Sequence, residues 1–315
     1  MNQKRSLKHK QGKYINVRNA FLICALILIY CPFFYTEMIG NYVGDTAIQI
    51  KVGIDCLVDK RLVPIEMYSW HEGLNWWPHE IGWYYIVGIA YGLFGLAGII
   101  GVAALFNYSI AGIIFKKYSS TVHPLIIVAV AAIARLFTFP NYNARPHLFS
   151  ELALVLVIYV MLSKKSMLYK SLFFCGASFL MSWIHGGMTP ILFAVFAIFI
   201  VMELVFKQFK TALYYLLAAA GAFVCSLLNP LGIKVWTYGF VNLSPAGGID
   251  VWDYNLEWAP KTFEIWEIAI LLLIFVAFIV DGRVKKFDKN AITRLCIFCM
   301  FLIASAKYCL SLIHI

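Results

Sequence analysis

The chain has 315 residues, of which 62% are hydrophobic and 13% charged. Soluble domains carry about 45–50% apolar and about 25% charged residues, so this composition excludes a soluble globular protein as well as a disordered chain. The net charge of +10 does not indicate nucleic-acid binding, because the basic residues stand in short clusters between apolar runs. We therefore expect an all-α, polytopic integral membrane protein with membrane lipids, and no nucleic acid, as partners.

The two ends of the chain differ from its apolar middle. Six Lys and Arg residues precede the first apolar run at Ala20, and no small-residue cleavage site follows that run. We therefore expect residues 1–18 to be a cytoplasmic basic tail rather than a signal peptide. The last six residues, 310–315, match what the end of a common sequencing transposon encodes, and they follow an apolar run with no closing loop. We expect a C-terminally truncated chain with a non-native tail at 310–315.

Apolar runs between these ends, over 19–309, predict a single transmembrane domain of about nine spans, because a span needs about 20 apolar residues. The predicted spans are 19–36, 96–115, 123–139, 148–163, 171–184, 188–206, 211–228, 265–280 and 291–309. A further apolar run, 81–94, is rich in Trp and Tyr. We expect it to be a helix lying in the membrane interface, and an additional span is the alternative.

Basic residues set the predicted orientation. With a cytoplasmic N-terminus and 81–94 not counted as a span, 18 of the 26 Lys and Arg residues fall in the cytoplasm and six outside. This asymmetry follows the positive-inside rule, whereas counting 81–94 as a span scatters the basic clusters over both faces. The long loops 37–95 and 229–264 then lie outside. Long loops usually carry function, so we expect an active extracytoplasmic face on a protein of the inner (cytoplasmic) membrane.

Polar residues of the first outer loop are candidates for chemistry. Asp45 follows the first span, and His79 and Glu80 precede the interface helix. A carboxylate just beyond a span is a candidate general base, and these three side chains together are candidate ligands of a divalent metal. The alternative for each carboxylate is an ordinary solvated position in a loop.

Two arginines are candidates for binding phosphate, since the guanidinium fork suits that group. Arg135 falls within a predicted span and Arg145 at the mouth of the next. Arginines at such depths are costly and indicate function, unless they extend to the headgroups. His185 precedes a pair of glycines at a turn between spans, where glycine permits close approach of another backbone. A packed histidine is the alternative there.

Further candidates lie in the same outer regions. They are His147, Asn229, Glu257 and Trp258. Asn229 also begins a segment, Asn-Pro-Leu-Gly, that is typical of a helix stop and turn. Although these residues are distant in sequence, the predicted topology places the polar candidates at one face, as in a site for a ligand that is part lipid and part polar.

These segments resemble a pattern in one poorly characterised branch of the GT-C superfamily, the multispanning bacterial glycosyltransferases that use polyprenyl-phosphate sugars. The matching segments are Asp45, Pro78–Ile81, Ala144–Ser150, Trp183–Gly187, Leu228–Gly232 and Glu257–Pro260. The match covers about residues 40–262 in the same order. It departs from the pattern at Pro78, where the family has Asn, and at His147, where it has Gln.

The resemblance implies a GT-C-like helical bundle with a catalytic Asp in the first outer loop, followed by an interface helix. It also implies later spans and often a C-terminal periplasmic domain, whose absence fits truncation. On this analogy Asp45 is the catalytic base, and Arg145 and Arg135 bind the donor phosphate. The residues that would shape the substrate site are His79, Glu80, His147, His185, Asn229, Glu257 and Trp258. The implied donor is a polyprenyl-phosphate-linked sugar and the acceptor a lipid or glycan of the envelope. The superfamily has metal-using and metal-free members, so a divalent metal stays open.

Two other functions fit the same topology. One is a transporter or flippase of a lipid-linked sugar, against which span centres carry few charges and no obvious broken helices. The other is a non-catalytic membrane scaffold or lipid-binding protein, which would tolerate replacement of Asp45, His79 and Glu257.

Overall fold

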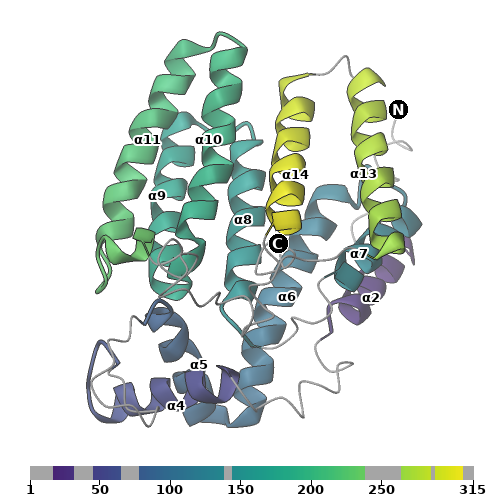
Figure 1. Ribbon diagram of the computed structural model, residues 1–315. Coiled ribbons are helices and arrows are strands. Elements are labelled where there is room, and N and C mark those ends of the chain that lie inside the picture. The colour runs from purple at the N-terminus through teal and green to yellow at the C-terminus, as the bar shows by residue number, and fades with distance from the viewer. Residues whose placement is uncertain are drawn as a thin grey trace, which may run out of the picture.

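The computed structural model of the chain describes residues 17–31, 45–64, 78–137, 144–237, 264–284 and 288–307. Regular structure in these ranges is helical, which confirms the predicted all-α class (Figure 1). The helices of ten or more residues are α2 (Val17–Ile29), α4 (Asp45–Val58), α5 (Ile81–Phe94), α6 (Leu96–Tyr118), α7 (Pro124–Phe137), α8 (His147–Met161), α9 (Met167–Ile184), α10 (Thr189–Val205), α11 (Phe209–Leu227), α13 (Ile265–Val284) and α14 (Lys289–Lys307). A 3-10 turn, η3 (Gly186–Met188), precedes α10. Most of the tail 1–18 and all of 310–315 lie outside the described residues.

Each of the nine predicted spans coincides with one helix, and the predicted interface segment 81–94 coincides with α5. Four segments are both long and apolar enough to cross a membrane: Leu96–Tyr118, Met167–Ile184, Gly186–Val205 and Phe209–Leu227. Shorter apolar helices accompany them, including α2, α5, α7 and α8. This set of helices is that of an α-helical membrane protein.

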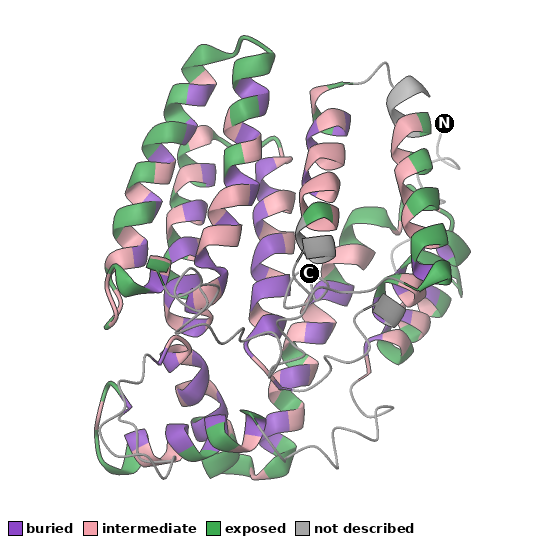
Figure 2. Cartoon of the chain, viewed as in Figure 1, coloured by how far each residue is buried: buried purple, intermediate pink, exposed green. Residues whose placement is uncertain are grey.

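The outward faces of the bundle are apolar. On α11 the exposed side chains include Leu213, Leu216, Leu217 and Val224, and Figure 2 shows such exposed positions along the outer side of this helix. In water a continuous apolar surface of this kind promotes aggregation. Hydrocarbon chains solvate it without cost, so the outward faces fit a lipid environment.

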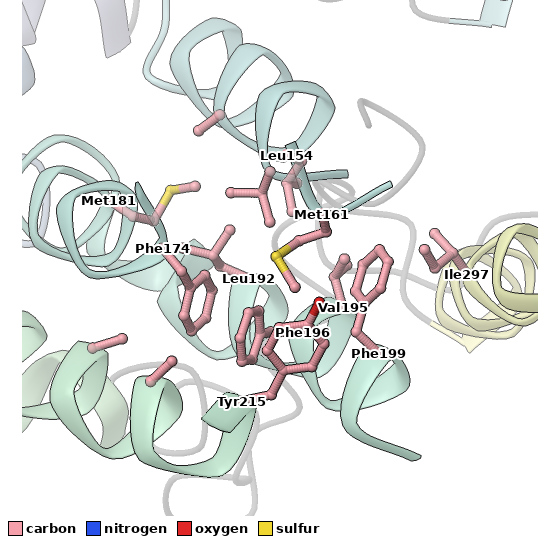
Figure 3. Close-up of a cluster of buried hydrophobic side chains, with 14 of the residues drawn as sticks. Leu154, Met161, Phe174, Met181, Leu192, Val195, Phe196, Phe199, Tyr215 and Ile297 are labelled. Carbon is pink, nitrogen blue, oxygen red and sulfur yellow. The ribbon is translucent and has the colours of Figure 1, made fainter. Parts of the chain in front are cut away.

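Aromatic and aliphatic side chains hold α8, α9, α10 and α11 together (Figure 3). Phe174 of α9 stacks on Phe196 of α10 with ring centroids 3.7 Å apart, and Tyr215 of α11 meets the same Phe196 edge-on at 5.5 Å. Ile297 attaches α14 to this cluster. The ends of α8 and α9 that carry the candidate site pack in a separate cluster, in which Leu148 and Ile184 lie with Trp83 of α5.

Helix α4 corrects the sequence analysis, which predicted a loop before residue 81. Its buried face repeats at helical spacing, through Thr46, Gln49, Ile50, Gly53 and Cys56. The opposite face is charged, with Lys51 paired to Asp55 one turn later at 2.6 Å. These charges interrupt the apolar run, so a search for continuous apolar segments does not find an amphipathic helix of this kind.

Helices α4 and α5 pack backbone against backbone. A methyl group on Gly88 of α5 would lie 2.7 Å from the carbonyl carbon of Gly53 in α4, so only glycine fits at this contact. In Figure 1, α4 and α5 lie together below the lower ends of α8–α11, and α4 runs crosswise to those four helices. Gly95, with φ +59°, then turns the chain from α5 into α6.

Replacing Gly88 by Ala tests this contact. The added methyl forces the two backbones apart, which should cost about 1–3 kcal/mol and lower the thermal unfolding midpoint in detergent. Gly92→Ala is the matched control, because nothing lies within 4 Å of its added methyl and alanine favours the helix. An equal effect of the two substitutions would contradict the close α4–α5 contact.

Candidate functional site

A backbone contact joins the segment before α5 to the bundle. The amide of Gly186 donates a hydrogen bond to the carbonyl oxygen of His79 at 2.8 Å. A side chain on Gly186 would stand 2.9 Å from that oxygen, so the glycine permits the approach. The His79-Glu80 and His185-Gly186 motifs, which are 106 residues apart in sequence, therefore meet at the end of α9.

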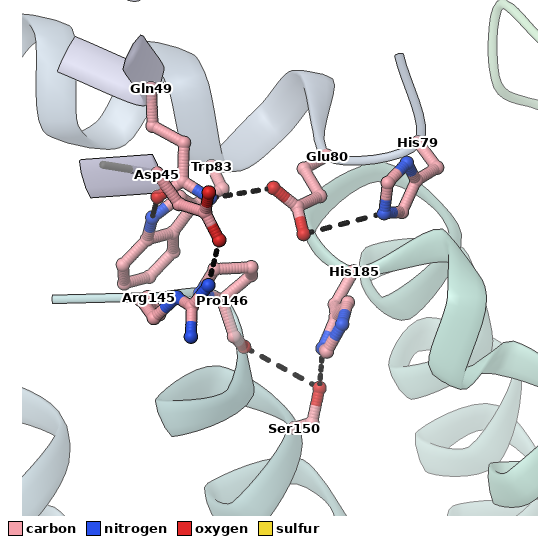
Figure 4. Close-up of polar contacts among 9 residues, drawn as sticks. All are labelled: Asp45, Gln49, His79, Glu80, Trp83, Arg145, Pro146, Ser150 and His185. Carbon is pink, nitrogen blue, oxygen red and sulfur yellow. Dashed lines mark hydrogen bonds and ion pairs between the residues drawn. The ribbon is translucent and has the colours of Figure 1, made fainter. Parts of the chain in front are cut away.

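Glu80 lies at the centre of a short hydrogen-bond network (Figure 4). Gln49 of α4 donates to Glu80 Oε2 at 2.7 Å, and His79 Nε2 lies 3.4 Å from Glu80 Oε1. The indole N–H of Trp83 lies 3.2 Å from both Gln49 Oε1 and the carbonyl of Ala144, to which it donates. The network links α4, α5 and the segment that leads into α8.

The carboxyl group of Glu80 is held in its ionised form. Burial raises the pKa of this group, but the attraction of His79 and the hydrogen bonds from His79 and Gln49 outweigh it, and the pKa lies below its usual value. Its side chain is only 13% exposed. We interpret Glu80 as a residue that positions its neighbours, because both of its oxygens already have partners.

Asp45 and Arg145 form an ion pair at the edge of this network. Asp45 is the first residue of α4, where the helix dipole favours a carboxylate, and Arg145 precedes α8. The Asp45 side chain is 55% exposed and that of Arg145 is 23% exposed. Among the candidate residues the structure therefore brings a reachable carboxylate next to a reachable guanidinium (Figure 4).

His185 packs against Ser150 of α8, with 2.6 Å between Nδ1 and the serine Oγ. Ser150 is fully buried, so its hydroxyl orients the imidazole rather than reaching a ligand. Burial lowers the pKa of His185 to about 4, and the positive charges of His79 and Arg145 act in the same direction, whereas Glu80 opposes them. The imidazole is therefore neutral at pH 7.

Arg135 lies in a second polar cluster. Its guanidinium donates to Asn107 of α6 at 2.8 Å and stands 4.7 Å from the ring centroid of Tyr30. The carboxyl group of Glu151 in α8 lies near it. Because Ser150 and Glu151 are consecutive, α8 connects this second cluster to the first.

The remaining predicted site residues occupy different positions. His147, the first residue of α8, is 6% exposed. Asn229 serves its own turn: its amide nitrogen donates to the Ser226 carbonyl at 2.5 Å, and its oxygen accepts from Leu231 N at 2.7 Å. The structure thus shows the helix stop and turn that the Asn-Pro-Leu-Gly segment also predicts. Glu257 and Trp258 lie outside the described residues.

The sequence analysis missed Gln49 and the pairing of Ser150 with His185. Gln49 follows Asp45 by one helical turn, a spacing that becomes informative only once 45–58 is known to be a helix. Within the described residues no three His, Cys, Asp or Glu side chains are placed to hold a metal ion. Asp45 pairs with Arg145 rather than joining His79 and Glu80.

No protein-family model, curated protein or solved structure matches the chain. A reachable carboxylate, a reachable guanidinium and a buried polar network stand at the end of an apolar bundle. This arrangement suits a ligand with an anionic group and hydroxyl groups, attached to an apolar tail.

The buried, neutral His185 predicts a pH dependence of stability. Between pH 6.5 and about 4 the unfolded chain binds a proton at His185 that the folded protein does not, so stability falls as the pH falls through this window. The loss over the whole window is on the order of 3 kcal/mol. Unfolding midpoints of wild type and His185→Gln at pH 7 and pH 5 measure it, and the variant should lose less.

The exposed His123 provides the control. His123→Gln should keep the wild-type loss between the two pH values, because it removes an exposed imidazole and leaves the buried His185 in place. A full wild-type loss in His185→Gln would contradict the buried, neutral state of this imidazole.

Proposed function

We propose that this protein is a membrane glycosyltransferase of the GT-C type. It moves a sugar from a polyprenyl-phosphate donor to an envelope acceptor on the extracytoplasmic face. The observation that carries the proposal is the pairing of Asp45 with Arg145, both partly exposed, where α4 meets the start of α8. One side chain can take a proton and the other can hold a phosphate within the same small site.

Arg145 is the residue that we assign to the donor phosphate. An ion pair as exposed as Arg145 with Asp45 contributes about 0–1 kcal/mol, so a phosphate replaces the carboxylate at little cost. The guanidinium can donate two parallel hydrogen bonds to phosphate oxygens. When the phosphate takes this partner, Asp45 is released to accept a proton.

The proposed reaction is a single displacement at the anomeric carbon. Asp45 takes the proton of the acceptor hydroxyl while that oxygen forms a bond to the anomeric carbon. The bond from this carbon to the phosphate oxygen breaks, and its electron pair leaves with the polyprenyl phosphate. Arg145 stabilises the charge that develops on the leaving phosphate, and the configuration of the sugar inverts.

The buried network supports this chemistry by fixing α4. Gln49 stands one turn after Asp45 and is held by Glu80 and Trp83. Glu80 is in turn beside His79, whose carbonyl is bonded to Gly186. The position of the proposed base therefore depends on residues that need not touch a substrate themselves.

Apolar surface near the site supports a lipid-linked donor. Helix α5 begins at the polar network with Ile81, and its far end exposes Ile89, Leu93 and Phe94. With 14 residues, α5 is about 21 Å long, which is less than the thickness of a bilayer core. An apolar helix of this length at the end of the bundle suits the interface, where a polyprenyl chain meets its phosphate.

Asp45→Asn should lower sugar transfer by about 10²–10⁴-fold, because the amide cannot accept the acceptor proton. The assay follows a radiolabelled sugar from a panel of polyprenyl-phosphate sugars into the lipid and glycan fractions of membranes that contain the protein. Asp55→Asn is the matched control: it removes a carboxylate from the same helix, where Asp55 pairs with Lys51, and should retain wild-type transfer.

Full transfer by Asp45→Asn would refute its role as base. If wild type transfers no sugar, and replacement of Asp45 and His79 leaves every phenotype unchanged, the scaffold function replaces the enzyme. Sugar movement across the bilayer without transfer would indicate a flippase.

A further inference from the structure

A cavity lies at the opposite end of the bundle from Asp45 and Arg145. It has a volume of about 240 Å³, far above the about 10–15 Å³ that admits one water molecule. Helix α8 runs between the two sites, from His147 to Met161, and its 15 residues place them about 22 Å apart. Its lining includes Lys164, Lys170, Glu203, Lys289 and Asn290. We call this space the lysine cavity.

The lysine cavity carries more positive than negative charge. Its lining contains three lysines and one carboxylate, that of Glu203. Both oxygens of Glu203 lie 2.9 Å from Lys289 Nζ, which neutralises one of the three cations. Lys170 is 8% exposed and donates to the neutral carbonyl of Met161 at 2.7 Å, while Lys164 is exposed. A net charge of about +2 thus faces a partly enclosed space.

Helix orientation adds to this positive potential. Lys170 lies in the first turn of α9, and Lys289 is the first residue of α14. Helix N-termini carry partial positive charge, so these are the ends at which a lysine is least favoured. Asp288 relieves part of the charge at α14, because its carboxylate accepts from Ala291 N at 2.7 Å. The potential within the cavity still favours an anion.

We propose that the lysine cavity binds a phosphate group as a site separate from the donor site. Lys164 and Lys170 supply the charge that faces the phosphate, and the amide of Asn290 supplies a neutral donor. The phosphate can come from an anionic lipid headgroup or from solution. Leu168 and Leu204, 69% and 44% exposed, border this end of the bundle, which places the cavity at headgroup depth for a lipid.

The test titrates the purified full chain, in neutral detergent, with short-chain phosphatidylglycerol, and follows binding by thermophoresis. Lys164→Gln should weaken binding about fivefold, the value of one lysine near an anionic lipid. Glu203→Gln should strengthen it by a similar factor, because it removes the one negative charge of the lining. Lys165→Gln is the matched control, because Lys165 is next to Lys164 in sequence but does not line the cavity, and its Nζ lies 5.5 Å from the Tyr169 ring centroid.

Two further titrations identify the source of the phosphate. Inorganic phosphate that competes with the lipid at equal affinity indicates a free anion, whereas preference for phosphatidylglycerol over both inorganic phosphate and phosphatidylcholine indicates a headgroup. Equal losses in Lys164→Gln and Lys165→Gln, or weaker binding in Glu203→Gln, would overturn the proposal. Such results would mean that the cavity binds no phosphate and that its Lys289–Glu203 ion pair only joins α14 to α10.

Discussion

The hydrogen bond from Gly186 to the His79 carbonyl is the contact on which the site around Asp45 and Arg145 depends. It joins the turn before α5 to the end of α9, and it forms only because residue 186 has no side chain. Once His79 is placed, Glu80 beside it reaches Gln49, and Gln49 fixes the first turns of α4. The position of Asp45 against Arg145 follows from this chain of contacts rather than from the ion pair itself, which is too exposed to hold a helix in place.

Charged groups gather at the two ends of the bundle and leave its middle to aromatic and aliphatic packing. At one end Asp45, Arg145 and Glu80 form a site with both signs of charge. At the other end the lining lysines outnumber Glu203. This division is what a membrane imposes, because a charge is costly within the hydrocarbon core and can remain only near water or beside a partner. Arg135 is a charge beside partners, because its guanidinium contacts Asn107 and the Tyr30 ring.

The sequence predicts the helices well and their internal contacts less well. Long apolar runs such as 96–115 and 188–206 have a single stable form in a bilayer, so composition alone locates them. Helix α4 escaped prediction because Lys51 and Asp55 interrupt its apolar residues, although its buried face has helical spacing. The convergence of His79, Glu80, Arg145 and His185 on one end follows from topology. Their actual partners, Gln49 and Ser150, depend on how helices pack, which no spacing along the chain encodes.

The central claim is that Arg145 holds the phosphate of a lipid-linked donor beside Asp45. Native mass spectrometry of the protein purified from bacterial membranes tests it directly, with Arg145→Ala and, as control, Arg61→Ala, another partly exposed arginine with an acidic partner, Asp59. We expect a co-purified polyprenyl phosphate in wild type and Arg61→Ala that is lost in Arg145→Ala. Only bulk phospholipid, unchanged between the three proteins, would contradict the donor site and favour a non-catalytic membrane protein.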